Sequence, residues 1–481
     1  MNLLNGIKKN NTITNTKGSE YYASTYDSNL DVFTMLSRYS SNKEMIRLFN
    51  NALNESEDLA LANLLYILDI RGGKGERRIF KTIFKNLCLN NPLCALRVLP
   101  FIGELGRYDY VLEGIDTPIH DEVISLIKLQ LDEDLKSEHP SLLAKWLPSH
   151  RTHNVNSLMA KKIMSGLNMT EKEYRKMLSE LRGKLNIVEK NLTDKKYENI
   201  DFSEVPTKAM LKYTNAYINK MSEKYSEYKN QLKQGKTKIN TDGLFVYEII
   251  KNVLWGTQLD DELYDLMWNN QKNVLEDCNT NVLVMADTSG SMTCYGGIPY
   301  AMSVGLALYT AERNTGIFKN HFITFSDKPY LCEVKGKTIK EKINNIPCYI
   351  ANTDIDRAFE LILETAKENK LKQEELPSHL LIISDMEFDQ GVYSKTGTNL
   401  DGWKKTFDSE GYKLPIIIFW NVAGSIRGVP ATKFDNDVAM ISGFSTNILE
   451  NLLTLENYTP TNIMLEKLSI YLEMLGKATN I

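Results

Sequence analysis

Hydrophobic residues follow two different patterns along the chain, and the change falls near residue 280. Before it, apolar residues recur every three or four positions, which is the spacing of one helix face. Almost no segment between residues 30 and 270 alternates in the manner of a strand. This pattern predicts helices at 59–68, 78–87, 95–102, 122–131 and 173–185.

Short apolar runs alternate with longer amphipathic runs in the second half of the chain. Alternating strands and helices of this kind are typical of a doubly wound, mostly parallel sheet with helices on both faces. We expect strands at 281–286, 321–325, 380–385, 414–422 and 438–442. We expect helices at 299–313, 357–366 and 448–453, with Ser445 as the cap of the last one.

The expected fold class is therefore α plus α/β. In the first half, short helices joined by turns with Asn, Gly or Pro indicate a HEAT-like helical repeat, although no clean sequence period is visible. A chain of 481 residues is too long for one ordinary core. We predict an N-terminal extension (1–24), a helical-repeat domain (25–275) and a doubly wound domain (279–481), with a polar loop or linker at 230–243.

Oxygen-bearing side chains stand where the predicted strands end. The first strand runs into Asp287-Thr-Ser289-Gly-Ser291, another ends at Asp385, and Thr353 lies just before a predicted helix. The carboxyl ends of parallel strands share one edge of a sheet, where ligands collect. Carboxylates and hydroxyls are hard oxygen ligands that suit Mg²⁺ or Mn²⁺. The alternative is that Asp287 caps a helix while the serines satisfy a turn.

In this order, Asp-x-Ser-x-Ser, then Thr, then Asp resembles the metal-ion-dependent adhesion site of von Willebrand factor A domains. The resemblance implies that Ser289, Ser291 and Thr353 are direct or near-direct ligands. It implies that Asp287 and Asp385 bind the metal directly or through water. In that family the last motif often reads Asp-Gly, whereas here Met386 follows the acid. The family's metal keeps an open position that accepts a carboxylate from a protein partner.

Composition describes a soluble globular protein, with 42% hydrophobic and 25% charged residues. No run approaches the roughly 18 apolar residues that span a membrane, and the N-terminus does not have the pattern of a secretory signal. The six cysteines (88, 94, 278, 294, 332 and 348) show no Cys-x-x-Cys spacing, which indicates reduced thiols. We therefore expect a cytoplasmic protein with no membrane association.

Five short motifs in the helical half do not resemble the sequence of an ordinary helical core. In order they begin at Arg71, Gly103, Ala144, Tyr174 and Ile200. Ahead of the metal motifs, they resemble the helical module shared by telomerase, Ro and vault proteins (the TROVE module), and more closely a related family of viral and cellular proteins. The resemblance implies an RNA-binding ring. The Gly-rich stretch 71–78 lacks the Walker pattern, so it is either a helix-ending turn or a phosphate contact.

Charge is segregated although the whole chain carries only −4. Basic residues exceed acidic ones by nine in 151–240, whereas acidic residues exceed basic ones by six in 101–150 and in 241–280. The basic segment predicts contact with an RNA backbone, and the alternative is a solvated helix face or, at 220–238, a loop. Bases would stack on Tyr174, Tyr197, Tyr213, Tyr217, Tyr225 and Tyr228. The candidate RNA contacts are Arg71, Lys74, Arg77, Arg78, Arg107, Lys145, Arg151, Arg175, Arg182 and Lys208.

The sequence gives little sign of catalysis. His150 and His153 lack further metal ligands at suitable spacing, and no nucleophile–base pair is visible. Asp354, Asp356, Glu387 and Asp389 could assist hydrolysis of a phosphodiester, but hydroxyl ligands dominate the metal loop. We therefore predict a non-enzymatic, Ro-like protein that binds structured or misfolded RNA and has a Mg²⁺-dependent site for a protein. The alternatives are a protein-assembly adaptor without RNA and a Mg²⁺-dependent nuclease.

Overall fold

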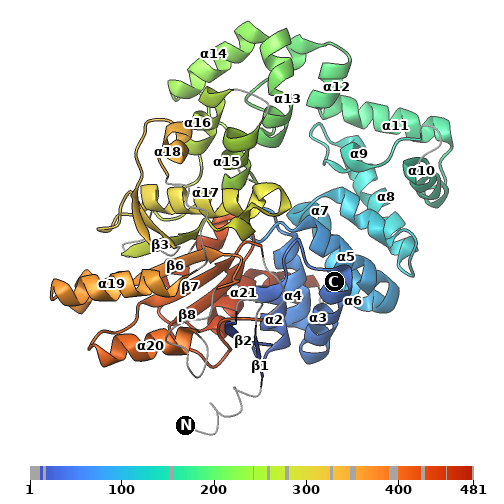
Figure 1. The fold of residues 1–481 in the computed structure, drawn as a ribbon. Coiled ribbons are helices and arrows are strands. Elements are labelled where there is room, and N and C mark those ends of the chain that lie inside the picture. The colour runs from blue at the N-terminus through green and yellow to red at the C-terminus, as the bar shows by residue number, and fades with distance from the viewer. Residues whose placement is uncertain are drawn as a thin grey trace.

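The computed structural model describes most of the 481 residues. The described residues are 11–14, 18–150, 155–241, 243–256, 260–276, 281–325, 329–346, 354–388, 399–423, 428–450 and 452–478. Their fold is α plus α/β, as expected: a helical first half and a six-stranded sheet in the second (Figure 1). No helix among these residues has both the length and the apolar character needed to cross a membrane.

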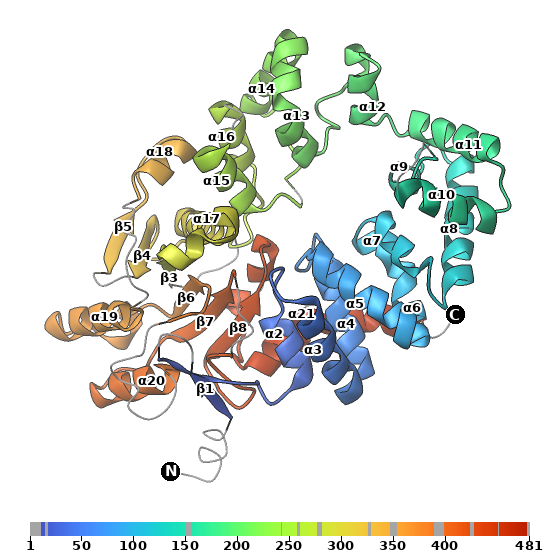
Figure 2. The same ribbon diagram turned by 45° about the vertical axis from the view of Figure 1, so that its right-hand side comes forward.

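The first half consists of short helices that follow one another along an arc, from α5 to α16 (Figure 2). Most of the expected helices are present, but 95–102 is interrupted at Pro100, which lacks the N–H that would continue a helix. Residues 220–238 are largely helical and not a loop. The α-helices are α2 (Ser28–Met35), α3 (Asn42–Glu55), α4 (Glu57–Leu68), α5 (Arg77–Asn90), α6 (Pro92–Val98), α7 (Ile102–Leu105), α8 (His120–Lys136), α9 (Leu143–Trp146), α10 (Val155–Gly166), α11 (Glu171–Lys184), α12 (Val188–Thr193), α13 (Thr207–Lys220), α14 (Ser222–Lys233), α15 (Val246–Trp255) and α16 (Asp261–Asn269).

The second half contains the sheet, with strand order β5-β4-β3-β6-β7-β8. All neighbouring strands are parallel except β4 and β5, which are antiparallel. The strands are β3 (Val282–Asp287), β4 (His321–Phe325), β5 (Tyr330–Glu333), β6 (His379–Ser384), β7 (Ile416–Asn421) and β8 (Val438–Ser442). The helices are α17 (Ile298–Arg313), α18 (Ile339–Asn344), α19 (Asp356–Glu368), α20 (Asn399–Ser409) and α21 (Pro460–Ala478).

One expected helix is absent. Of the described residues in 448–453, Ile448 and Leu449 belong to the 3₁₀ turn Thr446–Leu449, and Leu452 and Leu453 belong to the 3₁₀ turn Leu452–Thr454, rather than to an α-helix. Ser445 does cap the first turn, because its hydroxyl accepts from the N–H of Asn447. The apolar residues of this segment are buried in irregular structure, so their spacing imitated a helix face.

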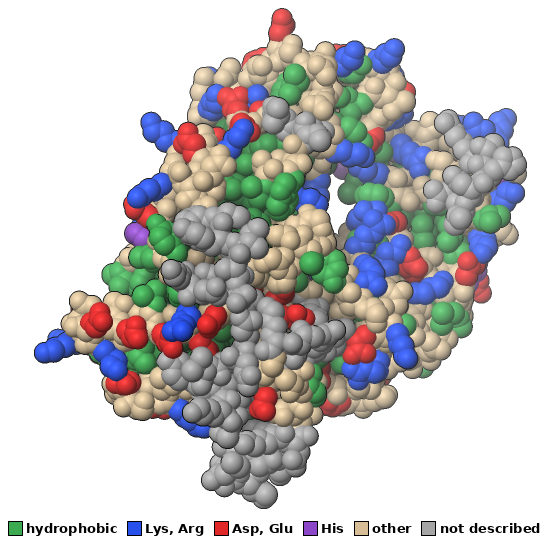
Figure 3. Space-filling model, in the orientation of Figure 1, with side chains coloured by type: hydrophobic (Ala, Val, Ile, Leu, Met, Phe, Trp, Pro, Cys, Tyr) green, Lys and Arg blue, Asp and Glu red, His purple; other side chains and the backbone are tan. Residues whose placement is uncertain are grey.

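The two halves are interlocked rather than joined end to end. Helix α2 packs on α3 and α4 and also against β8, and α21 packs against α4 (Figures 1 and 2). Both ends of the arc therefore contact the sheet through other helices: α5 packs on α4, which contacts α2, and α15 packs on α17, which lies on β3. The space-filling view shows a hollow within this arc, with Lys and Arg side chains gathered on its wall (Figure 3).

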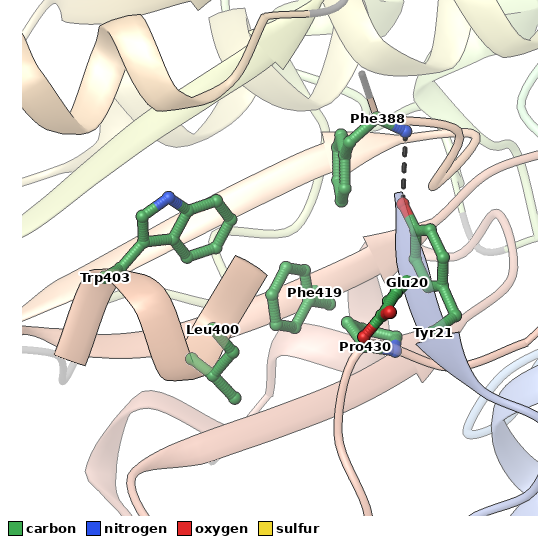
Figure 4. A pocket seen from close by; sticks show the side chains of 7 residues that line it. All are labelled: Glu20, Tyr21, Phe388, Leu400, Trp403, Phe419 and Pro430. Carbon is green, nitrogen blue, oxygen red and sulfur yellow. Dashed lines mark hydrogen bonds between the residues drawn. The ribbon is translucent and has the colours of Figure 1, made fainter. Parts of the chain in front are cut away.

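The N-terminal extension also packs against the second half. Strands β1 (Thr12–Thr14) and β2 (Glu20–Tyr22) form an antiparallel hairpin, and Tyr22 pairs with Val429 through two backbone hydrogen bonds of 3.0 and 2.8 Å. The hydroxyl of Tyr21 accepts a 3.1 Å hydrogen bond from the N–H of Phe388 (Figure 4). A residue of the N-terminal hairpin therefore holds the backbone that follows β6.

Candidate metal centre and candidate nucleic-acid interface

Two carboxylates meet where β3 and β6 end side by side in the middle of the sheet. The parallel register pairs Ala286 with Ile383, which places Asp287 beside Ser384. Asp287 and Ser384 are fully buried, and Asp385 is 7% exposed. The Ser384 hydroxyl donates to Asp287 Oδ2 at 2.6 Å, so it links the ends of the two strands.

The hydroxyls expected from the sequence lie in the same place. Ser289 donates its N–H to Asp287 Oδ1 at 2.9 Å, and the hydroxyl oxygens of Ser289 and Ser291 are 3.0 Å apart. Burial, together with the neighbouring charge of Asp385, raises the pKa of Asp287 to about 6. Two carboxylates in a buried setting repel each other, and a divalent cation between them would remove that repulsion.

The turn after Asp385 has an unusual backbone. Met386 has a φ of +64°, in the left-handed region that glycine adopts with little strain. Its N–H donates to Ser384 Oγ at 3.1 Å, and the N–H of Glu387 donates to Asp385 Oδ1 at 3.0 Å. These hydrogen bonds keep a left-handed turn at a position where the sequence has methionine in place of the glycine common in von Willebrand factor A domains.

The donor set fits Mg²⁺ or Mn²⁺ because it consists of hard oxygens. No group of three or more His, Cys, Asp or Glu side chains suited to a metal occurs among the described residues, so a metal at this place would have to bind hydroxyl oxygens beside the two carboxylates. Thr353 and Asp389 lie outside the described residues. Asp356 is buried and accepts from the indole N–H of Trp403 at 2.6 Å. Ser384 was not predicted, although a hydroxyl directly before Asp385 was visible in the sequence.

The hollow of the helical half forms a second candidate site, with a volume of about 1220 Å³. Helix α11 contributes Lys172, Arg175, Lys176, Ser179 and Arg182, which repeat at three- and four-residue spacing and therefore share one helix face. Seven basic residues line the hollow: Lys145, Lys172, Arg175, Lys176, Arg182, Lys190 and Lys212.

Acidic residues in the same hollow neutralise part of this charge. Glu171 lies 3.7 Å from Arg175 and 3.1 Å from Nδ1 of His150, and Glu189 lies 3.6 Å from Lys145. Lys172, Lys176 and Lys190 are exposed and make no ion pair within the described part of the chain. Sequence reasoning had named Lys145, Arg175 and Arg182 but missed these three lysines, although two of them follow the spacing of the α11 face.

Arg182 lines the hollow, but its guanidinium hydrogen-bonds to other residues of the protein. Its guanidinium donates to the carbonyls of Ala144 and Leu147 at 2.8 and 2.7 Å and to the Ser149 hydroxyl at 2.8 Å. Partial burial lowers the pKa of Arg182. Arg107 is engaged in a similar way, because Asp109 accepts two hydrogen bonds of 2.9 Å from it. Both arginines therefore fix local structure.

The other candidate RNA contacts do not line the hollow. Arg77 pairs with Asp109 at 3.1 Å, and Lys208 pairs with Glu248 at 3.1 Å. Arg78 donates to the carbonyls of Arg38 and Ser40. Arg71 is exposed, with a weak 3.4 Å contact to a carbonyl, and Arg151 lies outside the described residues.

Lys74 must be withdrawn as an RNA contact because it is 1% exposed. Its ammonium group donates to the Phe33 carbonyl and, at 2.7 Å, to Ser442 at the end of β8. Burial lowers the pKa of Lys74 to about 7. Nearby, Asp69 accepts from the hydroxyl of Tyr471 at 2.9 Å. The Gly-rich stretch 71–78 thus includes part of the joint between the two halves of the molecule.

The expected stacking role of the tyrosines is wrong for four of the six. Tyr174, Tyr217, Tyr225 and Tyr228 are buried. The last three pack around Phe202, with ring centroids 5.0–5.5 Å from its ring. Their helical spacing reflected a core face, so these rings are not accessible to a base.

Comparison with known proteins finds similarity to two domains of unknown function and to one viral protein. Residues 119–285 match a domain of unknown function, DUF2828, and residues 281–468 match another, DUF7788. The chain is 29% identical over 500 aligned positions to the uncharacterised protein L728 of Acanthamoeba polyphaga mimivirus, covering 94% of this chain and 86% of that protein.

Among solved structures, the chain is similar to the crystal structure of the Ro (RSR) protein of Deinococcus radiodurans. The similarity covers 88% of this chain and 90% of the other, with 16% sequence identity and a TM-score of 0.36. A TM-score of this size does not establish a shared fold.

Proposed function

We propose that this protein is a non-enzymatic scaffold that binds RNA through the basic hollow of its helical half. The observation that carries the proposal is the row of charges on one face of α11, where Lys172 and Lys176 line the hollow and have no ion-pair partner within the described part of the chain. Unpaired, exposed cations release counterions from a polyanion when they contact its phosphates.

The hollow has the properties of a site for a flexible nucleic-acid strand rather than for a small molecule. It is large, and its wall carries seven basic side chains against three acidic ones, Glu171, Glu189 and Asp194. A positively charged groove that follows the backbone is the usual way in which proteins bind single strands without reading their sequence. We propose structured or misfolded RNA, in which such strands are exposed, as the ligand.

The test is fluorescence anisotropy of labelled RNA at several salt concentrations. Lys172→Gln with Lys176→Gln should weaken binding and reduce the slope of log K against log salt by about 0.7 per lysine. Lys43→Gln with Lys405→Gln is the matched control, because it makes the same charge change at exposed lysines of α3 and α20. Absence of RNA binding at low salt, or equal weakening by both pairs, contradicts the proposal.

A second function is supported by the strand ends of the sheet. Asp287, Ser289, Ser291 and Asp385 offer hard oxygens within one buried region, and we propose that with Thr353 they hold Mg²⁺ or Mn²⁺. A bound ion with an open position would accept a carboxylate from a protein partner. This part of the proposal corresponds to a von Willebrand factor A domain within residues 279–481, preceded by a TROVE-like, HEAT-like repeat at 25–275.

Thermal denaturation with MgCl₂ tests the metal site against NaCl of equal ionic strength. Mg²⁺ at a hundredfold excess over its Kd should stabilise the protein by about 2.7 kcal/mol, and Asp385→Asn should abolish this effect. Asp437→Asn, at a partly exposed acid directly before β8, is the control. A Mg²⁺ effect that survives Asp385→Asn argues against the site.

Co-purification separates the proposal from its alternatives. A cytoplasmic RNA scaffold is expected to carry nuclease-sensitive ultraviolet absorbance. A protein-assembly adaptor would instead carry a metal-dependent protein band and no RNA. A Mg²⁺-dependent nuclease would cleave RNA in a reaction that Asp287→Ala removes.

A further inference from the structure

Trp146 differs from the other residues that line the hollow. It stands at the end of α9 and is the one indole or phenyl ring among the described lining residues. The indole is partly exposed, whereas four of the tyrosines expected to stack with bases are buried. An aromatic surface among cations is the combination that single-strand binding proteins use.

The ring of Trp146 is held in place from outside the hollow. The guanidinium of Arg107 lies 3.6 Å from the ring centroid, in stacking distance. Asp109 fixes that guanidinium through two hydrogen bonds of 2.9 Å. Arg107 does not line the hollow, whereas Trp146 does, as does Lys145, whose ammonium group lies 5.7 Å from the same ring centroid.

The backbone around Trp146 is held equally firmly. Arg182 donates to the carbonyls of Ala144 and Leu147, on either side of the tryptophan. The hydroxyl of the buried Tyr174 donates to the Pro148 carbonyl at 3.0 Å. Both clamps come from α11, the helix that carries the basic face. The ring is therefore preorganised relative to Lys172 and Lys176, which reduces the entropy lost on binding.

We propose that Trp146 is the residue on which a base of the bound RNA stacks, so that the hollow selects strands with unpaired bases. This inference rests on the proposed RNA-binding function. The lysines of α11 would contact phosphates, while the indole takes a base whose face is free. Duplex RNA presents no free base face at this position. Because every base has a π-face, the contact favours single strands without favouring a sequence.

The experiment compares three ligands of equal phosphate number: a single-stranded RNA, an abasic oligonucleotide and an RNA duplex. Trp146→Ala should weaken binding of the single-stranded RNA by about 5- to 150-fold, which is the range for loss of one stacked base. It should leave the affinity for the abasic oligonucleotide unchanged. Trp146→Phe should retain most of the affinity for the single strand, because a smaller ring still stacks.

Two control variants separate base stacking from charge and from general tryptophan loss. Lys172→Gln with Lys176→Gln should lower the affinity for the abasic oligonucleotide and for the single-stranded RNA by the same factor. Trp255→Ala removes a half-exposed tryptophan from α15, outside the residues that line the hollow, and should change neither affinity. Circular dichroism of each variant checks that it folds.

The outcomes distinguish failure of this inference from failure of the proposed function. If no ligand binds the unmodified protein at low salt, the RNA-binding proposal itself is wrong. If Trp146→Ala lowers the affinity for the single-stranded RNA and for the abasic oligonucleotide equally, Trp146 only maintains the structure of the hollow. That result overturns the inference. If Trp146→Ala does not fold, tryptophan fluorescence replaces it as the test. RNA should then quench emission of the unmodified protein more than emission of Trp146→Phe, and the abasic oligonucleotide should quench both equally; any other result overturns the inference.

Discussion

The carboxyl edge of the sheet and the basic hollow hold their functional side chains in opposite ways. At the edge, Asp287, Ser384 and Lys74 are buried, and each is engaged by neighbours from another segment. In the hollow, Lys172 and Lys176 are exposed and make no ion pair within the described residues. Buried polar groups cost free energy unless they are satisfied, whereas exposed charges are solvated and cost little.

Because of this difference, substitutions in the two regions should affect different properties, namely the free energy of unfolding and the affinity for RNA. Substitutions at the sheet edge should change the free energy of unfolding, because they leave a buried partner unsatisfied. Substitutions of the exposed lysines Lys172 and Lys176 in the hollow should change RNA affinity and leave the free energy of unfolding within about 0.5 kcal/mol.

The largest effect is expected for the pH dependence contributed by Lys74. Its pKa is lowered to about 7, whereas an unfolded lysine titrates near 10.4, so between these values the unfolded state binds the additional proton. Stability contributed by this group therefore rises with pH across the window, by up to about 1.4 kcal/mol per pH unit. Urea denaturation at several pH values should show that Lys74→Met removes this slope.

Lys172→Met is the matched substitution in the hollow. It also replaces one lysine by methionine, but at an exposed position, and should leave the pH dependence of stability as in the unmodified protein. If both variants show the same slope, Lys74 does not titrate in the folded protein as its burial implies.

An intermediate effect is expected when the link between the two central strands is cut. Ser384→Ala removes the donor to Asp287 and the acceptor for the N–H of Met386, both of them buried contacts. The free energy of unfolding should fall by about 1–3 kcal/mol, measured by urea denaturation. Ser179→Ala, at an exposed serine of the hollow, should have almost no effect. Equal stability of the two variants would remove the contrast between the regions.

The smallest effect is expected in the hollow. Glu171→Gln releases Arg175 and His150 from a shared carboxylate and should raise RNA affinity by roughly 1.5- to 5-fold, as expected for an exposed ion pair. Glu180→Gln makes the same charge change on α11, at a residue that does not line the hollow. Anisotropy at low salt should show a smaller gain for Glu180→Gln; an equal gain would mean that only net charge matters.

The sequence predicted the sheet better than the hollow, for a physical reason. Strands β4 and β8 lie where their apolar runs placed them, and the Asp287 and Asp385 motifs do end two neighbouring strands. Local sequence determines a strand end and the turn after it, so these residues could be found from spacing alone. Edge strand β5 was missed because its four residues, Tyr330–Glu333, are too few to show the period of a strand.

Which residues line the hollow depends on which face each helix turns inward. A count of charges along the sequence does not predict those faces. The excess of basic residues in 151–240 identified the right segment, but within it Tyr217 and Tyr225 are core residues. Outside that segment, Lys74 lies in a Gly-rich, basic stretch that resembles a phosphate-binding loop, yet its side chain is buried. The sequence did not reveal this burial because the partner of Lys74, Ser442, lies 368 positions away. Contacts at such separations cannot be inferred from local patterns.

Helix α2 has a consequence for how the chain reaches its native state. Seven of its eight residues are buried, and the Ser442 hydroxyl donates to the carbonyl of Phe33 across 409 positions. A ribosome therefore releases α2 long before β8 exists to cover it. Helices α3 and α4 can cover part of α2 soon after synthesis, but the face that packs on β8 must remain exposed or be covered temporarily, and closing so long a loop is slow. We expect refolding to be rate-limited by this late docking step, and chaperones to be most useful before β8 is complete.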